Sequence, residues 1–403
     1  MEIVFEEMGG MKIMILYANA GNGHRRAAEA LAAVCEKDER VGEVRLVDAL
    51  EYTNKIFQEL YSNLYIEAVK KAPTLWALAF DETDQPWHKE KMRMLIHRVN
   101  GLALTKQIKT FCPDLCLCTH FMPADIISAM LQEHQVQTDL GVVVTDYYVH
   151  ASWLESYLNR IYVAKSESRE QLLQLKFPPK RVRELGIPVD PVFGSLASRE
   201  ELFSAHQLDS NLPLVLLSAG AFGVMSGRDM AQMLNGISTP CHLVVVCGNN
   251  RKLKEQMERY VKDEGVEHIE YHILGFTKQM HEWMGMASLF VGKPGGLSSS
   301  ECLAIGLPMV IWNPIPGQEI YNTMFLLENG AAIAPDGAST LSFRIDQLLK
   351  DRDRLSQMRV AAKRLGRPNA AQDILDDAIE HLGEGVVVIP RDRRSLRDRL
   401  HLS

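Results

Sequence analysis

The feature that most constrains this chain is a series of apolar strand patterns, each followed by a turn and a helical pattern, that starts near residue 11 and again near residue 212. MKIMILYA at 11–18 is apolar except for Lys12, a pattern typical of a strand buried on both faces of a parallel sheet. HLVVVC at 242–247 has the same character. The alternation predicts an α/β fold with two parallel-sheet domains, whose strands end at a shared ligand-binding cleft.

Two prolines near residue 190 suggest where the first domain ends, in the run IPVDP at 187–191. A chain of 403 residues has room for two or three domains of roughly 100–200 residues each. We predict an N-terminal domain over 11–190 and a C-terminal domain over 191–382, which closes with a helical stretch from about 341. Residues 383–403 are predicted to form a basic tail that contains five arginines.

Composition excludes several classes of protein. The net charge of −7 argues against a general nucleic-acid binder, and no apolar run reaches the roughly 18–20 residues that span a bilayer. The acidic first ten residues do not resemble a signal peptide, so we expect a cytoplasmic protein. The seven cysteines lack the second paired cluster that a cysteine zinc site needs, and we expect all of them to be reduced.

The turn after the first strand, ANAGNGH at 18–24, joins a buried strand to a helix. Glycines allow the backbone to approach a ligand, and a helix N-terminus favours negative charge. Arg26 stands where the dinucleotide fingerprint has its third glycine, so the turn is not that motif. An ordinary structural turn is the alternative, but the predicted position of His24 at the cleft favours a functional role.

Two further polar clusters follow strands of the second half, in addition to the turn SAGAFG at 218–223. GKPGGLSSSE at 292–301 is suited to contact with phosphate and ribose, and Glu301 is placed to accept hydrogen bonds from ribose hydroxyls. A helix-start charge favoured by the macrodipole is the simpler reading of Glu301. NPIPGQE at 313–319, with Asn322 beyond it, offers donors and acceptors for sugar hydroxyls.

These segments resemble the monogalactosyldiacylglycerol synthase and processive diacylglycerol glucosyltransferase family, inverting family 28 enzymes with the two-domain GT-B fold. The matching segments run from Met11 to about Ala334: ANAGNGH, VVTDYYVHASW (143–153), GIPVDPVF (186–193), SAGAFGV (218–224), VVVCGNN (244–250) and GKPGG…SECLAIGLP…NPIPGQE. GNGH, KPGG and PGQE are closer to the bacterial glucosyl-transferring branch. The resemblance implies transfer of a hexose from a UDP-sugar to diacylglycerol or a glycosyl-diacylglycerol, with glucose favoured over galactose although the sequence does not fix the hexose.

The resemblance also implies roles for particular residues. The donor would be held at the diphosphate by Gly220, Gly223, Gly295, Gly296 and Ser298, at the uracil by Phe276, at the ribose by Glu301, and at the hexose by Gln318, Glu319 and Asn322. The acceptor side would comprise Gly23, His24, Asp146 and His150.

Inverting transfer requires a base for the acceptor hydroxyl, and stabilisation of the departing diphosphate. His24 is the first choice as base, because imidazole acts near neutral pH. Asp146 is the second, either as base or as a partner that orients a histidine. The chain has no paired-carboxylate DxD motif. Helix N-terminal amides would stabilise the leaving group, so we predict chemistry without a metal or other cofactor.

A lipid acceptor requires access to the membrane without a spanning helix. Residues 48–109 combine aromatic with basic side chains, which suits peripheral attachment to an anionic inner membrane surface. Core aromatics on helices with solvated basic faces would give the same pattern. Two rival functions are an N-acetylglucosaminyltransferase acting on another lipid acceptor, and a UDP-sugar-binding sensor without turnover.

Overall fold

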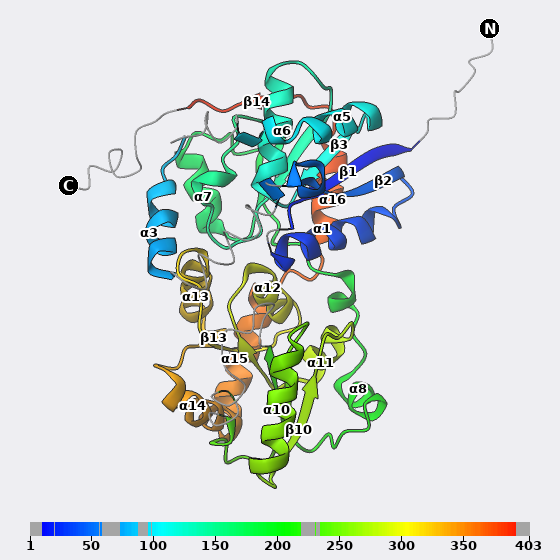
Figure 1. The fold of residues 1–403 in the computed structure, drawn as a ribbon. Coiled ribbons are helices and arrows are strands. Elements are labelled where there is room, and N and C mark those ends of the chain that lie inside the picture. The colour runs from blue at the N-terminus through cyan, green and yellow to red at the C-terminus, as the bar shows by residue number, and fades with distance from the viewer. Residues whose placement is uncertain are drawn as a thin grey trace. The chain divides into compact units, whose positions relative to one another are not determined.

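The computed structural model describes residues 10–19, 21–55, 57–58, 73–87, 96–97, 99–218, 230 and 234–391. The chain divides into two compact units, each built on its own sheet (Figure 1). The first comprises the chain up to Pro191 together with Pro316–Gln318 and Asn369–Ser403. The second comprises Val192–Ile315 and Glu319–Pro368. The predicted class, an α/β fold with two parallel-sheet domains, is confirmed.

The N-terminal unit contains a six-stranded sheet in the order β2-β1-β3-β4-β6-β7, with every pair parallel. Its strands are β1 (Met11–Tyr17), β2 (Val41–Asp48), β3 (Leu115–Cys118), β4 (Asp139–Val143), β6 (Arg160–Val163) and β7 (Val182–Glu184). The α-helices around it are α1 (Asn22–Cys35), α3 (Pro73–Thr83), α5 (Leu102–Phe111), α6 (Phe121–Gln132) and α7 (Ser166–Gln174). Short 3-10 helices are η1 (Ala49–Tyr52), η2 (Ala151–Trp153) and η3 (Pro191–Gly194).

The C-terminal unit repeats this plan with the order β10-β9-β8-β11-β12-β13, again parallel throughout. Its strands are β8 (Leu214–Ser218), β9 (Cys241–Val246), β10 (Ile269–Leu274), β11 (Leu289–Gly292), β12 (Met309–Ile311) and β13 (Ala332–Ile333). The helices are α8 (Arg199–Ala205), α10 (Arg251–Glu264), α11 (Met280–Met286), α12 (Gly296–Ala304), α13 (Gln318–Glu328), α14 (Ala338–Lys350) and α15 (Arg352–Leu365).

Each sheet has a point where the chain order reverses, and there the carboxyl ends of two neighbouring strands lie at one edge of the sheet. In the N-terminal unit these strands are β1 and β3, and in the C-terminal unit they are β8 and β11. Ligands of open α/β sheets bind at such switch points. The first turn and the GKPGG turn, both singled out in the sequence, follow β1 and β11.

The end of the chain corrects the predicted domain limits. Residues 369–382, predicted as part of the C-terminal domain, belong to the N-terminal unit, where α16 (Ala370–Glu380) lies beside α1 (Figure 1). Ile374 and Leu375 are fully buried in a core that includes Leu31 of α1. The helical pattern of 341–382 is divided among α14, α15 and α16, and periodicity alone does not say which sheet each helix covers.

Residues 383–391, the described part of the predicted basic tail, pack against the N-terminal unit. β14 (Val387–Val388) pairs antiparallel with β5 (Tyr157–Leu158), and Ile389 is buried in the N-terminal core. The Arg391 guanidinium donates to Ser156 Oγ at 2.7 and 2.9 Å. The arginines beyond residue 391 lie outside the described residues.

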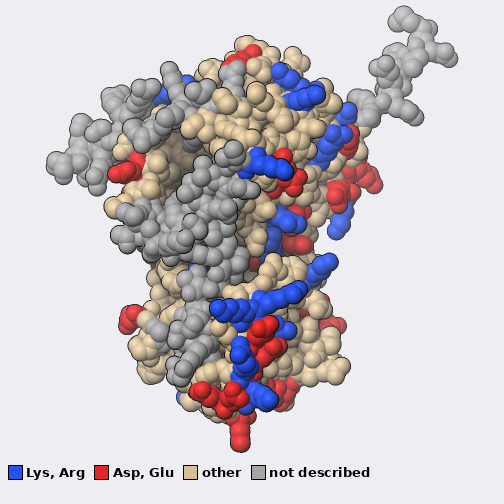
Figure 2. Space-filling view, in the orientation of Figure 1, with Lys and Arg blue, Asp and Glu red and all other residues tan. Residues whose placement is uncertain are grey.

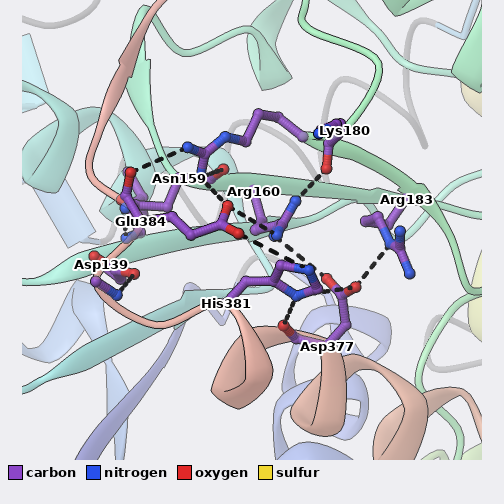
Figure 3. Close-up of polar contacts among 11 residues, drawn as sticks. Asp139, Asn159, Arg160, Lys180, Arg183, Asp377, His381 and Glu384 are labelled. Carbon is purple, nitrogen blue, oxygen red and sulfur yellow. Dashed lines mark hydrogen bonds and ion pairs between the residues drawn. The ribbon is translucent and has the colours of Figure 1, made fainter.

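A buried arginine joins this returning segment to the sheet (Figure 3). The Arg160 side chain, only 4% exposed, lies 3.5 Å from Asp377 and 3.2 Å from Glu384 and also donates to the Lys180 carbonyl. Arg183 forms a second ion pair with Asp377 at 2.8 Å. Because a buried charge is costly without partners, this network ties α16 and the following turn to β6 and β7.

The aromatic-basic region is described only in part. Phe80 of α3 and Trp87 are buried, and Trp87 stacks on Phe177 with ring centroids 6.4 Å apart, so these two aromatics pack in the protein rather than facing a membrane. This part of the interfacial prediction is wrong, because both rings fill the core. The prediction also rested on other aromatic and basic residues of 48–109, which lie outside the description: Tyr61, Tyr65, the Trp76 side chain, Lys70, Lys71, Lys89, Lys91, Arg93 and Arg98.

Two predictions from composition can be compared with the structure. All seven cysteines are free, and six of them are buried, as expected for reduced core residues. Among the described residues no helix is long and apolar enough to cross a bilayer. On the face drawn in Figure 2, basic and acidic side chains are interspersed rather than segregated.

Candidate functional site

His24 lies in the first turn of α1, directly after β1, at the switch point of the N-terminal sheet. Its Nδ1 is 2.8 Å from the Thr119 carbonyl oxygen and 3.0 Å from Thr145 Oγ1. The Thr119 hydroxyl in turn donates to the His24 carbonyl at 2.8 Å. Residues that follow β3 and β4 therefore hold both the backbone and the ring of His24.

These contacts set the tautomer of His24. A carbonyl oxygen only accepts hydrogen bonds, so Nδ1 carries the proton and the lone pair of the neutral ring is on Nε2. Nε2 has no hydrogen-bond partner among the described residues. Desolvation lowers the pKa of His24 from its usual 6.5 to about 4, although the bond to Thr119 opposes the shift. The ring is therefore neutral at physiological pH, with a nitrogen able to accept a proton.

Aromatic rings surround His24. His120 lies edge-on at 4.6 Å between ring centroids, and Trp153 is at 6.1 Å. His120 caps α6 by accepting from the Met122 amide at 3.0 Å, and burial holds its pKa well below the ordinary value. This packing limits the rotation of the His24 ring and supplies the low-dielectric surroundings that disfavour imidazolium.

The other acceptor-side residues lie close to this turn in the chain or in the sheet. Gly23 directly precedes His24 in α1, and Asp146 is a half-buried residue one position after Thr145. The hydrogen bonds described for His24 go to Thr119 and Thr145, so the orienting acceptor is a backbone carbonyl rather than Asp146. The role of Asp146 as an alternative base stays a prediction.

His150 has both ring nitrogens in structural contacts. Nδ1 accepts from the Ser152 amide at 3.1 Å, and Nε2 lies 3.1 Å from the Phe80 carbonyl of α3. Asp84 supports the same junction by accepting from the Ala151 amide at 2.8 Å. The structure thus places His150 where it fastens α3 to the loop after β4, and its role on the acceptor side stays a prediction.

On the donor side, the GKPGG turn leads directly into α12. Gly295 is the N-cap residue and no side chain caps the helix, while the first helical bond runs from the Ser299 amide to the Gly295 carbonyl at 2.9 Å. The amides of Gly296, Leu297 and Ser298 precede that bond. The first amides of a helix have no acceptor within it, which together with the macrodipole makes this end suited to an anion.

The two polar clusters of the C-terminal half meet, as their positions after β11 and β12 predict. The buried Asn322 amide donates to the Pro294 carbonyl at 3.0 Å, and so fixes the turn before α12. A Cβ added at Gly295 would lie 3.9 Å from Glu319 Oε1. Asn322 is fully buried, so the structure gives it a supporting position behind the turn; direct contact with the hexose stays a prediction.

Glu301 and Glu319 are both buried carboxylates. Glu301 lies within α12 and is 2% exposed. Glu319 accepts from the Ile315 amide at 2.5 Å, and desolvation raises its pKa to about 7, opposed by that bond and by Lys293. A carboxyl with this pKa is partly protonated at neutral pH, so it can both donate and accept hydrogen bonds to hydroxyl groups.

The other residues predicted to bind the UDP-sugar differ in their burial. Gln318 is half-buried as the first residue of α13, and Phe276 is exposed beyond the carboxyl end of β10. An exposed aromatic ring at this edge is compatible with stacking on a base. Gly220 and Gly223 lie outside the described residues, and their predicted contacts with the diphosphate stay predictions.

Sequence reasoning missed Thr119 and Thr145, which orient the His24 ring. Both follow buried strands directly, and polar residues at the carboxyl ends of parallel strands were the available signal. One group of potential metal ligands, His242, Glu270 and His272, also escaped notice because its members come from two strands. It lies near the amino ends of β9 and β10, away from the donor turns.

Two family models match parts of this chain. Residues 24–189 match the monogalactosyldiacylglycerol (MGDG) synthase family model, and residues 227–374 match the glycosyltransferase family 28 C-terminal domain. A processive diacylglycerol beta-glucosyltransferase of Bacillus licheniformis is 28% identical over 372 residues, covering 91% of this chain and 94% of the relative.

Solved structures share the fold. MurG of Acinetobacter baumannii superposes with a TM-score of 0.56 at 15% identity, over 91% of this chain and 98% of that one. Anabaena Alr3699/HepE in complex with UDP-glucose gives 0.53 at 14% identity, over 92% of this chain and 100% of that one. At such low identity these likenesses establish the architecture alone.

Proposed function

The chain belongs to the family of monogalactosyldiacylglycerol synthase and the processive diacylglycerol glucosyltransferases, and from this premise we propose that it transfers a hexose from a UDP-sugar to diacylglycerol or a glycosyl-diacylglycerol. The observation that carries the proposal is His24, a neutral histidine fixed at the switch point with Nε2 available as a base. The product is a membrane glycolipid.

The proposed transfer inverts the anomeric configuration. The acceptor hydroxyl attacks the anomeric carbon while the bond from that carbon to the UDP oxygen breaks, and His24 Nε2 takes the hydroxyl proton. Because Nδ1 already donates to the Thr119 carbonyl, the imidazolium formed keeps a hydrogen bond that stabilises its new charge. UDP departs with the bonding electron pair and with the negative charge that the reaction must stabilise.

We propose that backbone amides stabilise this charge. The uncapped N-terminus of α12 supplies donors in fixed positions, which is the arrangement that favours a developing anion. Such donors support transfer without a catalytic metal. Turnover that persists after exhaustive treatment with EDTA is the expected result, and restoration by Mg²⁺ or Mn²⁺ alone would contradict it.

The donor is proposed to be UDP-glucose in preference to UDP-galactose. The relative from Bacillus licheniformis is named a glucosyltransferase, and Alr3699/HepE was solved with UDP-glucose. The partly protonated Glu319, with Gln318 beside it, provides donors and acceptors for hexose hydroxyls. The difference between the two hexoses is one hydroxyl, and a site that hydrogen-bonds a hydroxyl can discriminate strongly.

The test is a product analysis on vesicles that contain diacylglycerol. The purified full chain is incubated separately with UDP-glucose, UDP-galactose and UDP-N-acetylglucosamine, and the extracted lipids are analysed by mass spectrometry. We expect hexosyl-diacylglycerol with UDP-glucose, accompanied by species with additional hexoses if the enzyme is processive. A lipid product with UDP-N-acetylglucosamine alone, or UDP-sugar binding without any product, would overturn the proposal.

Contact with an anionic membrane surface is part of the proposal and places the protein on the cytoplasmic face. Four exposed apolar side chains in the aromatic-basic region support it: Leu78, Ile96, Val99 and Leu102. Exposed apolar groups near a lipid-acceptor site suit insertion at an interface. Replacing Val99 and Leu102 together by serine should weaken sedimentation with anionic vesicles while soluble UDP binding is unchanged. Equal sedimentation of the variant would contradict this role.

A further inference from the structure

Three potential metal ligands meet on one face of the edge of the C-terminal sheet. His242 is the second residue of β9, and its register partner on the edge strand β10 is Glu270. His272 lies two residues further along β10, so it projects from the same face as Glu270. The opposite face of these strands carries the apolar core, which includes Cys241 and Ile269.

The distances among the three side chains match a small tetrahedral site. His242 Nδ1 is 3.0 Å from Glu270 Oε2 and 3.3 Å from His272 Nε2, and all three ligand atoms lie within 4.8 Å of one another. Bonds of about 2.0–2.1 Å in a tetrahedron place ligand atoms about 3.3 Å apart. The side chains are therefore close to positions from which one ion could contact all three.

The tautomer of His242 directs a lone pair into this group. His242 Nε2 lies 2.9 Å from the Asp209 carbonyl, so it carries the ring proton and Nδ1 of the neutral ring is an acceptor. That atom faces a carboxylate oxygen and a second imidazole, while His242 is fully buried. An imidazole held through its other nitrogen by a backbone carbonyl is the usual outer-shell arrangement of a metal-binding histidine.

The surroundings also suit a bound cation. Aromatic rings pack beside both imidazoles. The Phe203 ring centroid lies 5.9 Å from that of His242, and the Trp283 ring centroid lies 6.3 Å from that of His272. Glu270 is about half exposed, so its side of the group is open to solvent and to an entering ion.

We propose that His242, Glu270 and His272 bind one divalent transition-metal ion, with Zn²⁺ the best fit and water as the fourth ligand. Two imidazoles and one carboxylate favour Zn²⁺ over Mg²⁺ or Ca²⁺, which prefer oxygen ligands. The site lies at the amino ends of the strands, opposite the donor turns. Its role is structural: the ion clamps the edge strand β10 to β9 and leaves the transfer chemistry to the other end of the sheet.

The direct test measures binding to the intact chain. Protein stripped with EDTA and dialysed is titrated with Zn²⁺ in competition with a chromophoric chelator, and separately with Co²⁺ to record the ligand-field spectrum. One high-affinity equivalent and a tetrahedral Co²⁺ spectrum are expected. Absence of a stoichiometric site, or an octahedral Co²⁺ spectrum, would overturn the proposal.

Variants locate the ion. Changes to outer-shell partners of a metal ligand lower metal affinity by roughly 10–100-fold. Removing a ligand itself should cost at least as much as the largest of these, so we expect His272→Ala to bind Zn²⁺ about a hundredfold more weakly. Glu270→Gln is the second variant, because its exposed side chain does not contribute to the core and the protein will fold. His281→Ala is the matched control, a partly exposed histidine on α11 outside the group. Unchanged affinity in both ligand variants would refute the site.

A thermal measurement separates this inference from the proposed function. Zn²⁺ should raise the melting temperature of the wild-type chain in a concentration-dependent way and should not raise that of His272→Ala. Turnover at low temperature should be the same with and without the ion. If the chain shows no glycosyl transfer, the metal site can still be present. If Zn²⁺ does not raise the melting temperature, the proposed transfer is not affected.

Discussion

The two units place their candidate functional groups at the same point of two similar sheets but build them from different material. In the N-terminal unit the site consists of side chains, with the His24 imidazole held by Thr119 and Thr145. In the C-terminal unit it consists largely of backbone, with a glycine turn and the amides of α12. The difference predicts opposite sensitivities: the first site is broken by removing atoms, and the second by adding them.

Burial acts on titratable groups in both units and favours the neutral form in each. It lowers the pKa of His24 to about 4 and raises that of Glu319 to about 7. In the first unit the result is an uncharged base, while in the second it is a carboxyl that shares its proton near neutral pH. The pH dependence of the contribution to stability therefore has opposite sign in the two units.

The largest effect is expected from His24→Ala. Removing a general base lowers turnover by about 10²–10⁴-fold, whereas the Michaelis constant for the UDP-sugar should change little because most of the proposed donor contacts lie in the other unit. Steady-state kinetics with vesicle-bound diacylglycerol measure both quantities. The matched control is His134→Asn, an exposed histidine of the same unit whose positive φ of 54° asparagine accepts readily.

The pH profile sharpens the assignment. A folded-state pKa depressed below the unfolded value gives a contribution to stability that is present above about pH 6.5 and is lost as the pH falls through 4. The acid limb of kcat/KM should accordingly lie near pH 4, if measured at temperatures where the protein stays folded. Near-full turnover in His24→Ala, or an acid limb at 6.5, would remove His24 as the base and favour Asp146.

Next in size is the effect of Arg160→Met on the N-terminal unit. The substitution leaves Asp377 buried without its deepest partner, and losing one member of a buried ion pair costs about 3–5 kcal/mol. Hydrogen exchange should show loss of protection in α16 and β6, with the C-terminal sheet unaffected. The control Arg183→Met removes the more exposed partner of Asp377 and should cost about 1 kcal/mol or less. Equal protection in both variants would contradict the role of Arg160.

The sequence allowed prediction of the fold, the first turn and the GKPGG turn, because each depends on local order: an apolar strand, glycines, then a helix. It could not assign α16 to the N-terminal unit, since the apolar face of that helix would suit either sheet. β13 and β14, of two residues each, are too short to give a periodic signal.

Candidate site residues that directly follow a strand could be proposed from the sequence, because local order marks them. Contacts between segments far apart in the chain could not. The bond from His24 to the Thr119 carbonyl spans 95 residues and uses a backbone atom, which no residue pattern encodes. Phe80 and Trp87 were misplaced because aromatic residues among basic ones look alike on a core helix and on an interfacial one. Packing alone distinguishes the two cases.

Glu319→Gln should change how the stability of the C-terminal unit depends on pH. The folded-state pKa of Glu319 is raised, so its contribution to stability is complete below about pH 4.5 and is lost as the pH rises through 7. Glutamine cannot ionise and should make the protein more stable at pH 8, by up to about 3 kcal/mol, with little change at pH 5. Thermal melts across this pH range test the sign, and a pH-independent difference would refute the raised pKa.

The smallest effect tests whether the N-terminus of α12 holds the diphosphate. Gly295 has φ −61°, and a Cβ there meets only Glu319 Oε1 at 3.9 Å, so the fold tolerates a side chain. Gly295→Asp should stabilise the helix by a few tenths of a kcal/mol, because aspartate is a better N-cap than glycine. The same carboxylate would repel a diphosphate and should weaken UDP binding about tenfold, or about 1.4 kcal/mol, measured by calorimetry.

Gly337→Asp is the matched control for this opposition of stability and binding. Gly337 is the N-cap of α14 in the same unit and has no atom within 4 Å of an added Cβ, so aspartate should stabilise that helix to a similar degree. UDP affinity should not change, because the electrostatic effect of one exposed carboxylate falls off within a turn and is screened by salt. If Gly295→Asp binds UDP as tightly as Gly337→Asp does, the diphosphate does not lie at α12.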